Sequence, residues 1–199
     1  STAIPSGATG YEIEQSLRFN DSDVSYLSKT PASASNRRLW TWSGWVKKGA
    51  LGKGRQEIFR GGATWENATQ IAFGASDCIW INTYAGSWLT SLKTTALHRD
   101  SSAWYNIVVV YDTAQGTEAN RIKIYVNGEQ ITSFSESNYP SQNYEGHINS
   151  TTLHTLGMGV NADANNNFDG YLAEVNFIDG AAKVPADFGE TGDYGEWKP

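Results

Sequence analysis

The strand pattern is strongest in "SAWYNIVVVYD" (Ser102–Asp112), and a polar loop separates it from "RIKIYVNGEQIT" (Arg121–Thr132). β-Branched and aromatic residues recur with a period of two in both runs, which predicts two β-strands. Both faces of the first run are apolar, so we expect a central strand that is covered on both sides. In the second run, Asn127-Gly128 predicts a two-residue hairpin turn of type I′, because both central residues of that turn need a positive φ.

Short strand patterns of the same kind continue along the rest of the chain, and helical periodicity is almost absent. Twenty glycines divide these runs, as expected where short strands meet at turns. About a dozen such strands predict an all-β fold, an antiparallel β-sandwich of the jelly-roll kind. We expect residues 1–16 to form an N-terminal arm, 17–188 the sandwich domain, and 189–199 a C-terminal tail or linker. Docking of this tail on the domain through Phe188 and Trp197 is left open.

Length, charge and cysteine content narrow the range of function classes. A chain of 199 residues fits one domain. Its net charge of −6 and pI near 5.0 argue against nucleic acid as a partner, because a phosphate backbone attracts a basic surface. The longest apolar run, around "IVVVY", is far too short for membrane insertion. Cys78 is the only cysteine, so no intrachain disulfide is possible. The N-terminal residues show no signal-peptide pattern. The chain starts at Ser1 without an initiator methionine, so we expect a processed product or a piece of a longer chain.

The tryptophans fall into two main groups by sequence context. "ATWENATQ" places Trp65 beside small polar residues that include Asn67, and "NTYAGSWLTS" places Tyr84 and Trp88 around a turn. Aromatic faces combined with amides are typical of sugar sites, so these four are candidate ligand-binding residues. Packing at the end of the sandwich is the alternative, since surface aromatics often only pack. We expect the other group in the core, because its members lie inside strong strand patterns: Trp40, Trp42, Trp45, Trp80 and Trp104.

A long polar stretch from Ser133 to Thr152 shows no strong periodicity. It is too long for an ordinary connection, which makes it a candidate functional loop. Its tyrosines, Tyr139 and Tyr144, are amphipathic contact residues of the kind that recognition loops use, and we include them among the candidate ligand-binding residues. A solvated loop without a partner is the alternative.

"NADANNNFDGYLAEV" (Asn161–Val175) carries regularly spaced oxygen-bearing side chains. The spacing resembles an EF-hand, but Phe168 replaces the glycine of that loop and a strand pattern follows instead of a helix. We expect a loop between two strands, with Phe168 turned into the core, Asp169 tying the loop to the backbone, and Gly170 letting the chain re-enter the sheet. Strand alternation would carry Glu174 away from the loop. If a cation binds, calcium is the candidate, and its ligands would be Asp163, Asn165, Asn167 and Asp169.

Three segments together resemble a known family: "RLWTWSGWVKKG", "WYNIVVVYD" followed by "RIKIYVNGEQI", and "LGMGVNADANNNFDGYLAEVNFIDG". Their order and spacing are similar to those of the laminin-G-like, or concanavalin A-like, lectin/glucanase jelly roll, over about Leu17 to Phe188. The stretches "SLRFNDSDVSYLSKTPASASNRRLWTWSGWVKKG" and "FDGYLAEVNFIDGAA" are similar to lectin-like modules in structural proteins of tailed bacteriophages. The resemblance implies a lectin-like sandwich, in a family that contains both lectins and enzymes.

The sequence lacks the acidic motif that the enzymes of this family carry. Retaining glucanases of the fold place two glutamates around an aspartate on one strand face, as Glu-x-Asp-x-x-Glu or a close variant. Glu12 and Glu14 have no third acid near them. Asp169 and Glu174 are five positions apart, which would place them on opposite faces of a strand. The three histidines are scattered and form no nucleophile–base pattern. We therefore predict that the protein is not an enzyme.

We expect a non-catalytic carbohydrate-binding module of a virion structural protein, in a tail fibre or capsid. Its partners would be a glycan or host-surface polysaccharide and other virion structural proteins, and its location the virion surface, outside the cell. Two alternatives stay open: a purely structural or decoration module of the virion, and a glycan-cleaving hydrolase.

Overall fold

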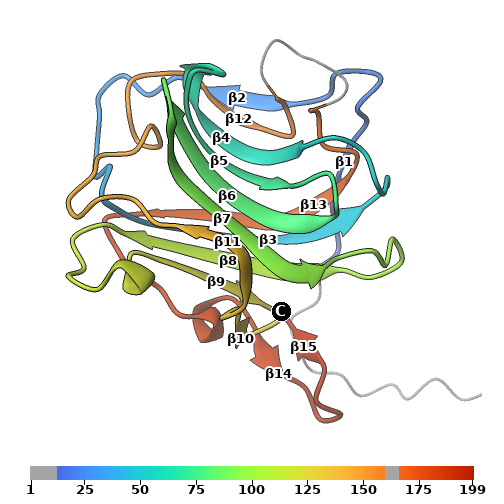
Figure 1. The fold of residues 1–199 in the computed structure, drawn as a ribbon. Helices are drawn as coiled ribbons and strands as arrows, with labels where there is room; N and C mark the ends of the chain where they lie inside the picture. The colour runs from blue at the N-terminus through green and yellow to red at the C-terminus, as the bar shows by residue number, and fades with distance from the viewer. Residues whose placement is uncertain (1–12, 160–165) are drawn as a thin grey trace, which may run out of the picture.

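The computed structural model describes residues 13–159 and 166–199, which form a sandwich of two antiparallel sheets (Figure 1). In spatial order, the six-stranded sheet contains β1 (Leu17–Phe19), β13 (Gly170–Asp179), β3 (Leu39–Lys48), β8 (Tyr105–Asp112), β9 (Ile122–Val126) and β10 (Glu129–Gln130). The seven-stranded sheet contains β11 (Phe134–Asn138), β7 (Trp88–Leu97), β6 (Cys78–Ala85), β5 (Asn67–Phe73), β4 (Gln56–Thr64), β12 (His154–Leu156) and β2 (Leu27–Lys29).

Helix in the described residues is limited to short 3₁₀ turns, such as η1 (Glu118–Asn120) and η3 (Pro185–Asp187). All strand ladders of the two sheets are antiparallel. The predicted all-β antiparallel sandwich is therefore confirmed.

The hairpin predicted at Asn127-Gly128 joins β9 to β10. Both turn residues have a positive φ, 50° and 83°, and Val126 pairs directly with Glu129 across the turn, as a type I′ turn requires. The second arm is short, because the chain soon crosses to the other sheet. There it forms β11, which pairs with β7 at the sheet edge. The stretch predicted as a long loop therefore contains a strand, whose exposed polar residues hide the alternation.

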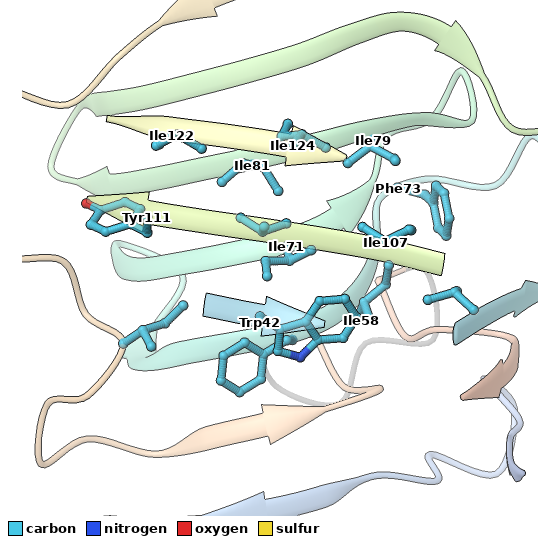
Figure 2. Packing of buried hydrophobic residues seen from close by; sticks show 14 of the residues in the cluster. Trp42, Ile58, Ile71, Phe73, Ile79, Ile81, Ile107, Tyr111, Ile122 and Ile124 are labelled. Atoms are coloured by element: carbon cyan, nitrogen blue, oxygen red, sulfur yellow. The ribbon is translucent and has the colours of Figure 1, made fainter. Parts of the chain in front are cut away.

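The hydrophobic core lies between the two sheets and combines inward-facing residues from both. Figure 2 shows isoleucines of β4, β5 and β6 meeting Trp42, Ile107 and Tyr111 of the facing sheet. The Trp40 ring stacks on the Tyr111 ring at a centroid distance of 4.8 Å. Burial of apolar surface is the main favourable contribution to folding, at about 25 cal/mol per Å² buried.

Only two of the five tryptophans expected in the core lie between the sheets. Trp40 and Trp42 are completely buried there. Trp45 follows them on β3 but points to the outer face, opposite Asn106, and is buried by other parts of the chain. Trp80 also points outward, from β6, and Trp104 precedes β8 and lies beside Tyr171. Trp45 is buried as expected, although on the outer face. The expectation was wrong for Trp80 and Trp104, which are only partly buried, because a period-two pattern does not say which face meets the partner sheet.

The C-terminal segment docks on the outer face of the six-stranded sheet. Two short strands, β14 (Glu190–Thr191) and β15 (Trp197–Lys198), pair with each other at the lower edge of the molecule in Figure 1. The Trp197 indole nitrogen donates a hydrogen bond to Asn106 Oδ1 at 3.2 Å. The tail therefore docks on the domain through Trp197 and is not a free linker.

Candidate functional site

A row of polar side chains crosses the outer face of the seven-stranded sheet. Phe59, Ile71, Ile81 and Leu92 belong to the core between the sheets, so strand alternation points the residue next to each of them outward. Directly paired residues of neighbouring strands share a face. The resulting polar row takes one residue from each strand: Ser28, Thr155, Arg60, Gln70, Asn82, Ser91 and Asn138.

Central members of the polar row are buried without their full set of hydrogen bonds. Gln70 and Asn82 are 2% and 1% exposed. Gln70 Oε1 has no hydrogen-bond partner, and neither polar atom of the Asn82 side chain has one. A buried polar group in this state costs about 1–3 kcal/mol. A ligand with hydroxyl groups would recover part of this cost by bonding to these atoms.

Beside the polar row, Glu57 of β4 is completely buried between two arginines. Its Oε1 lies 2.9 Å from Arg55 Nη2, and its Oε2 lies 3.5 Å from Arg60 Nε. Neither contact has hydrogen-bonding geometry. A register shift between Glu57 and Phe59 brings Glu57 and Arg60 to the same face. Burial raises the pKa of Glu57 to about 7, against the opposing effect of the two arginines.

Four aromatic rings lie against one another beside the polar row, and we call them the aromatic cluster: Trp65, Tyr84, Trp88 and Trp80. Trp65 stacks on Tyr84 at 5.5 Å, Tyr84 meets Trp88 edge-on at 4.9 Å, and Trp88 lies 5.3 Å from Trp80. Trp65 and Trp88 are 53% and 46% exposed. An exposed group of large rings on a folded domain commonly marks a binding surface.

Trp80 connects the aromatic cluster to the polar row and to two cations. Its indole nitrogen donates a hydrogen bond to Ser91 Oγ at 2.9 Å. Lys93 Nζ lies 4.6 Å from the ring centroid and the Arg55 guanidinium 5.8 Å from it, within the range of cation–π attraction. Lys93 also pairs with Glu136 at 2.7 Å. These contacts hold the Trp80 ring in place over the sheet.

Four of the six predicted ligand-binding residues lie at this place. Trp65, Tyr84 and Trp88 are in ring contact, and exposed Asn67 begins β5 two residues after Trp65. The two tyrosines of the polar stretch do not join them.

Those two tyrosines pack against the body of the domain. Tyr139 is partly buried against the core, and burial raises the pKa of Tyr144. In the described residues neither ring contacts the aromatic cluster.

Most of the polar part of the site was not predicted from the sequence. Trp80 was expected in the core, and no residue of the polar row was among the candidates. The signal was present in "TQIAF" and "CIWIN", where Gln70, Trp80 and Asn82 alternate with isoleucines. Which alternate residues faced the core depended on the partner sheet.

The candidate calcium loop is described only in part, because Asp163 and Asn165 lie outside the described residues. Asn167 Oδ1 accepts a hydrogen bond from the Gly159 amide at 3.1 Å. Asp169 Oδ1 lies 2.6 Å from Arg18 Nη2. The Asp169 side chain therefore ties the loop to a side chain of β1, whereas a bond to the backbone was expected. Among the described residues, no group of three or more His, Cys, Asp or Glu side chains is placed to hold a metal ion.

The predictions for Phe168 and Gly170 are confirmed. Phe168 is completely buried and lies 6.2 Å from the Phe19 ring. A Cβ on Gly170 would come within 2.1 Å of the Lys47 carbonyl oxygen. Only glycine allows the two strands to approach so closely at the start of β13.

Acidic residues on the outer face of the seven-stranded sheet are too far apart to act together on a glycosidic bond. Glu57 lies on β4 and Glu136 on β11, with three strands between them. At about 4.8 Å per strand the separation along the sheet is roughly 19 Å. Glycoside hydrolases hold their two carboxyl groups about 5–10 Å apart. This pair cannot supply that chemistry.

Comparisons with known proteins place the fold. The solved structures similar to this chain include domain 4 of AbnA, an extracellular arabinanase from Geobacillus stearothermophilus in complex with arabinotriose (17% identity, TM-score 0.56, 79% of this chain and 67% of that one). They also include domains LG4-5 of the mouse laminin alpha1 chain (13% identity, TM-score 0.54, 88% and 44%). A third is a leech intramolecular trans-sialidase (15% identity, TM-score 0.56, 82% and 27%). At these identities the likeness concerns the fold.

A comparison with curated protein sequences gives no match. In the described residues no helix is long and apolar enough to cross a membrane. A family model described as the concanavalin A-like lectin/glucanases superfamily matches residues 21–185, which is most of the chain. The chain therefore belongs to the concanavalin A-like lectin/glucanases superfamily.

Proposed function

We propose that the protein is a non-catalytic carbohydrate-binding module, and that its glycan lies across the polar row against the aromatic cluster. The observation that carries this proposal is the side-by-side position of exposed rings and buried, unpaired amides on one face. Sugars present apolar C–H patches and hydroxyl groups, and this face offers a partner to each.

Each part of the face would have its own role in binding. The Trp65 and Trp88 rings would stack on the C–H faces of sugar rings, where apolar contact is worth about 25 cal/mol per Å² buried. Asn82 and Gln70 would hydrogen-bond hydroxyl groups, because a hydroxyl both donates and accepts. Since the polar row runs across all seven strands, an extended oligosaccharide fits this face better than a single sugar.

The wide separation of Glu57 and Glu136 supports binding without cleavage. We also propose, from the resemblance of the chain to phage modules, that the glycan is a host-surface polysaccharide and that the module is displayed on a virion surface beside other virion structural proteins. Copurification from assembled particles would test this second part.

A glycan array tests the main proposal, followed by titration of the best-binding oligosaccharide. We expect Trp88→Ala to lower affinity about tenfold, which corresponds to about 1.4 kcal/mol. Tyr194→Ala is the matched control, because Tyr194 is 96% exposed and lies far along the chain from the cluster. Binding that survives in Trp88→Ala, or that is lost equally in Tyr194→Ala, contradicts the assignment of this face. Release of shorter sugars from the bound glycan contradicts the non-catalytic role.

A further inference from the structure

The outer face of the six-stranded sheet carries a pocket of about 770 Å³, within the roughly 300–1,000 Å³ range of ligand sites. Ser43 and Trp45 of β3, Asn106 of β8 and Asn176 of β13 line it from the sheet, and residues 186–190 of the C-terminal segment line it from above. It lies on the opposite side of the sandwich from the polar row. The two places can therefore bind ligands independently.

The C-terminal segment that covers this pocket is fastened to the sheet at both ends. Thr41 Oγ1 donates to the Ala181 carbonyl at 2.8 Å and accepts from the Lys183 amide at 3.0 Å. Near the other end, Trp197 donates to Asn106 Oδ1. The pocket is thus walled by anchored parts of the chain, which keeps its shape before any ligand arrives.

Two polar side-chain atoms at the floor of the pocket are buried without a hydrogen-bond partner. Ser43 and Asn106 are each 1% exposed, and Ser43 Oγ and Asn106 Nδ2 make no hydrogen bond. Ser43 pairs with Val108, two residues from Asn106 on the same strand, so the two groups are diagonal neighbours on one face. Two such groups side by side are uncommon in a native fold and indicate a missing partner.

A strained residue stands at the edge of the same pocket. Glu174 has φ 46° in the middle of β13, where the register shifts between Ala173 and Asn176. This bulge inserts a residue and changes the phase of the strand. Val175 consequently packs toward the core, and Glu174 lines the pocket.

The Glu174 conformation is unfavourable for a residue with a side chain, by about 1–3 kcal/mol. Among the described residues its carboxylate forms no ion pair, so no salt bridge offsets this cost. Strained residues cluster at binding sites, so the strain at Glu174 indicates that its carboxylate contacts a ligand in the pocket. Its neighbour Asn176 fixes the bulge by donating a hydrogen bond to the Glu174 carbonyl at 2.9 Å.

We propose that this pocket is a second binding site and that it takes a neutral, hydroxyl-rich ligand, a terminal sugar residue. The Asn106 amide nitrogen only donates and the Glu174 carboxylate only accepts, while Ser43 does both. A sugar presents hydroxyl groups that satisfy all three, with Trp45 beside its apolar face. The pocket is lined by three carboxylates, Glu174, Asp187 and Glu190, and by one ammonium group, that of Lys183, so an anionic ligand would be repelled. An ammonium group could not accept a hydrogen bond from Asn106.

Nuclear magnetic resonance with the ¹⁵N-labelled protein tests this proposal. The probes are D-glucose, D-galactose, D-mannose and N-acetyl-D-glucosamine, with D-glucosamine and D-glucuronate as cationic and anionic comparisons. We expect at least one neutral sugar to shift the amide signals of Ser43 and Asn106 and the Trp45 indole signal. If no neutral sugar does so, or if a charged analogue binds more tightly, the proposal is overturned. Shifts confined to Trp65 and Trp88 would support only the first site and overturn the second.

Variants separate binding from folding. Ser43→Ala should lower the affinity for the shifting sugar about 3- to 10-fold, the loss of one hydrogen bond, without lowering the melting temperature. Glu174→Gly should raise the melting temperature by removing strain and still weaken binding. Lys123→Ala is the matched control, since Lys123 pairs with Val110 on the same outer face but lies outside the pocket. Unchanged affinity in Ser43→Ala and Glu174→Gly overturns the proposal.

Discussion

Tryptophans on the two sides of the same sandwich show what a strand pattern leaves undecided. Trp40 and Trp42 are completely buried between the sheets, and even their indole nitrogens lack a hydrogen-bond partner. The core tolerates this because each ring buries a large apolar area. Trp65 and Trp88 are about half exposed on the outer face, beside amides that also lack partners. The first pair stabilises the fold, and the second leaves ring area exposed on the outer face.

The largest effect expected is on core packing. Trp42→Ala should lower the free energy of unfolding by about 3–5 kcal/mol, through lost burial and the cavity that remains. Trp88→Ala should lower it by less than about 1 kcal/mol, because half of the ring is already in water. Urea denaturation measures both variants. Equal losses in the two would remove the contrast between core and outer face.

A second effect concerns pH and Glu57. Its pKa in the folded protein is about 7, above the ordinary 4.5, because of burial. The folded state therefore holds this proton more tightly than the unfolded state. The stabilisation is full below about pH 4.5 and is lost as pH rises through about 7, by on the order of 1–3 kcal/mol.

Denaturation at several pH values tests this expectation. Relative to wild type, Glu57→Gln should gain stability as pH rises from about 4.5 to 7, because the variant lacks the contribution that Glu57 loses over this range. The two proteins are compared at each pH because burial lowers the pKa of three histidines, which add stability as pH rises over part of the same range: His98, His147 and His154. Glu136→Gln is the control, because hydrogen bonds from Lys93 and Ser91 lower the pKa of Glu136 and its contribution changes below about pH 4.5. A difference in stability between wild type and Glu57→Gln that stays constant from about pH 4.5 to 7 would contradict the buried, proton-binding state of Glu57.

Calcium provides a third and smaller test, at the loop before β13. If calcium binds there, a concentration ten times its dissociation constant should stabilise the native state by about 1.4 kcal/mol. Melting with calcium and with chelator measures the difference. Equal melting midpoints with calcium and with chelator would mean that Asn167 and Asp169 do not bind calcium. Their role would then be structural, through the contacts with Gly159 and Arg18.

The smallest effect expected is the removal of an unpaired amide. Asn82→Leu should change the free energy of unfolding by less than about 1 kcal/mol, since neither polar atom of Asn82 has a partner to lose. Titration with the best-binding oligosaccharide should nevertheless show weaker binding. A large loss of stability would mean that Asn82 supports the fold. The outer face would then contribute to stability as the core does.

Much of the fold was predictable because its signals are local. Alternation predicted the strands β8 and β9, and Asn127-Gly128 predicted the hairpin from β9 to β10, since a turn with two positive φ values strongly selects these residues. Phe168 was predicted to be buried because it is the one large apolar residue in a polar run. The candidate ligand-binding residues Trp65, Asn67, Tyr84 and Trp88 were recognisable from their polar surroundings near turns.

Three further features depended on contacts between distant strands. The polar row exists only because Arg60, Gln70, Asn82 and Ser91 come into register across four strands. Bulges at Glu57 and Glu174 change which side chains share a face. Alternation fixes the spacing of outward residues within one strand, but register, bulges and the docking of the C-terminal segment arise from pairing between residues far apart in the chain. The sequence alone thus determined the strands, their turns and the exposed rings, and tertiary pairing decided which polar groups those rings stand beside.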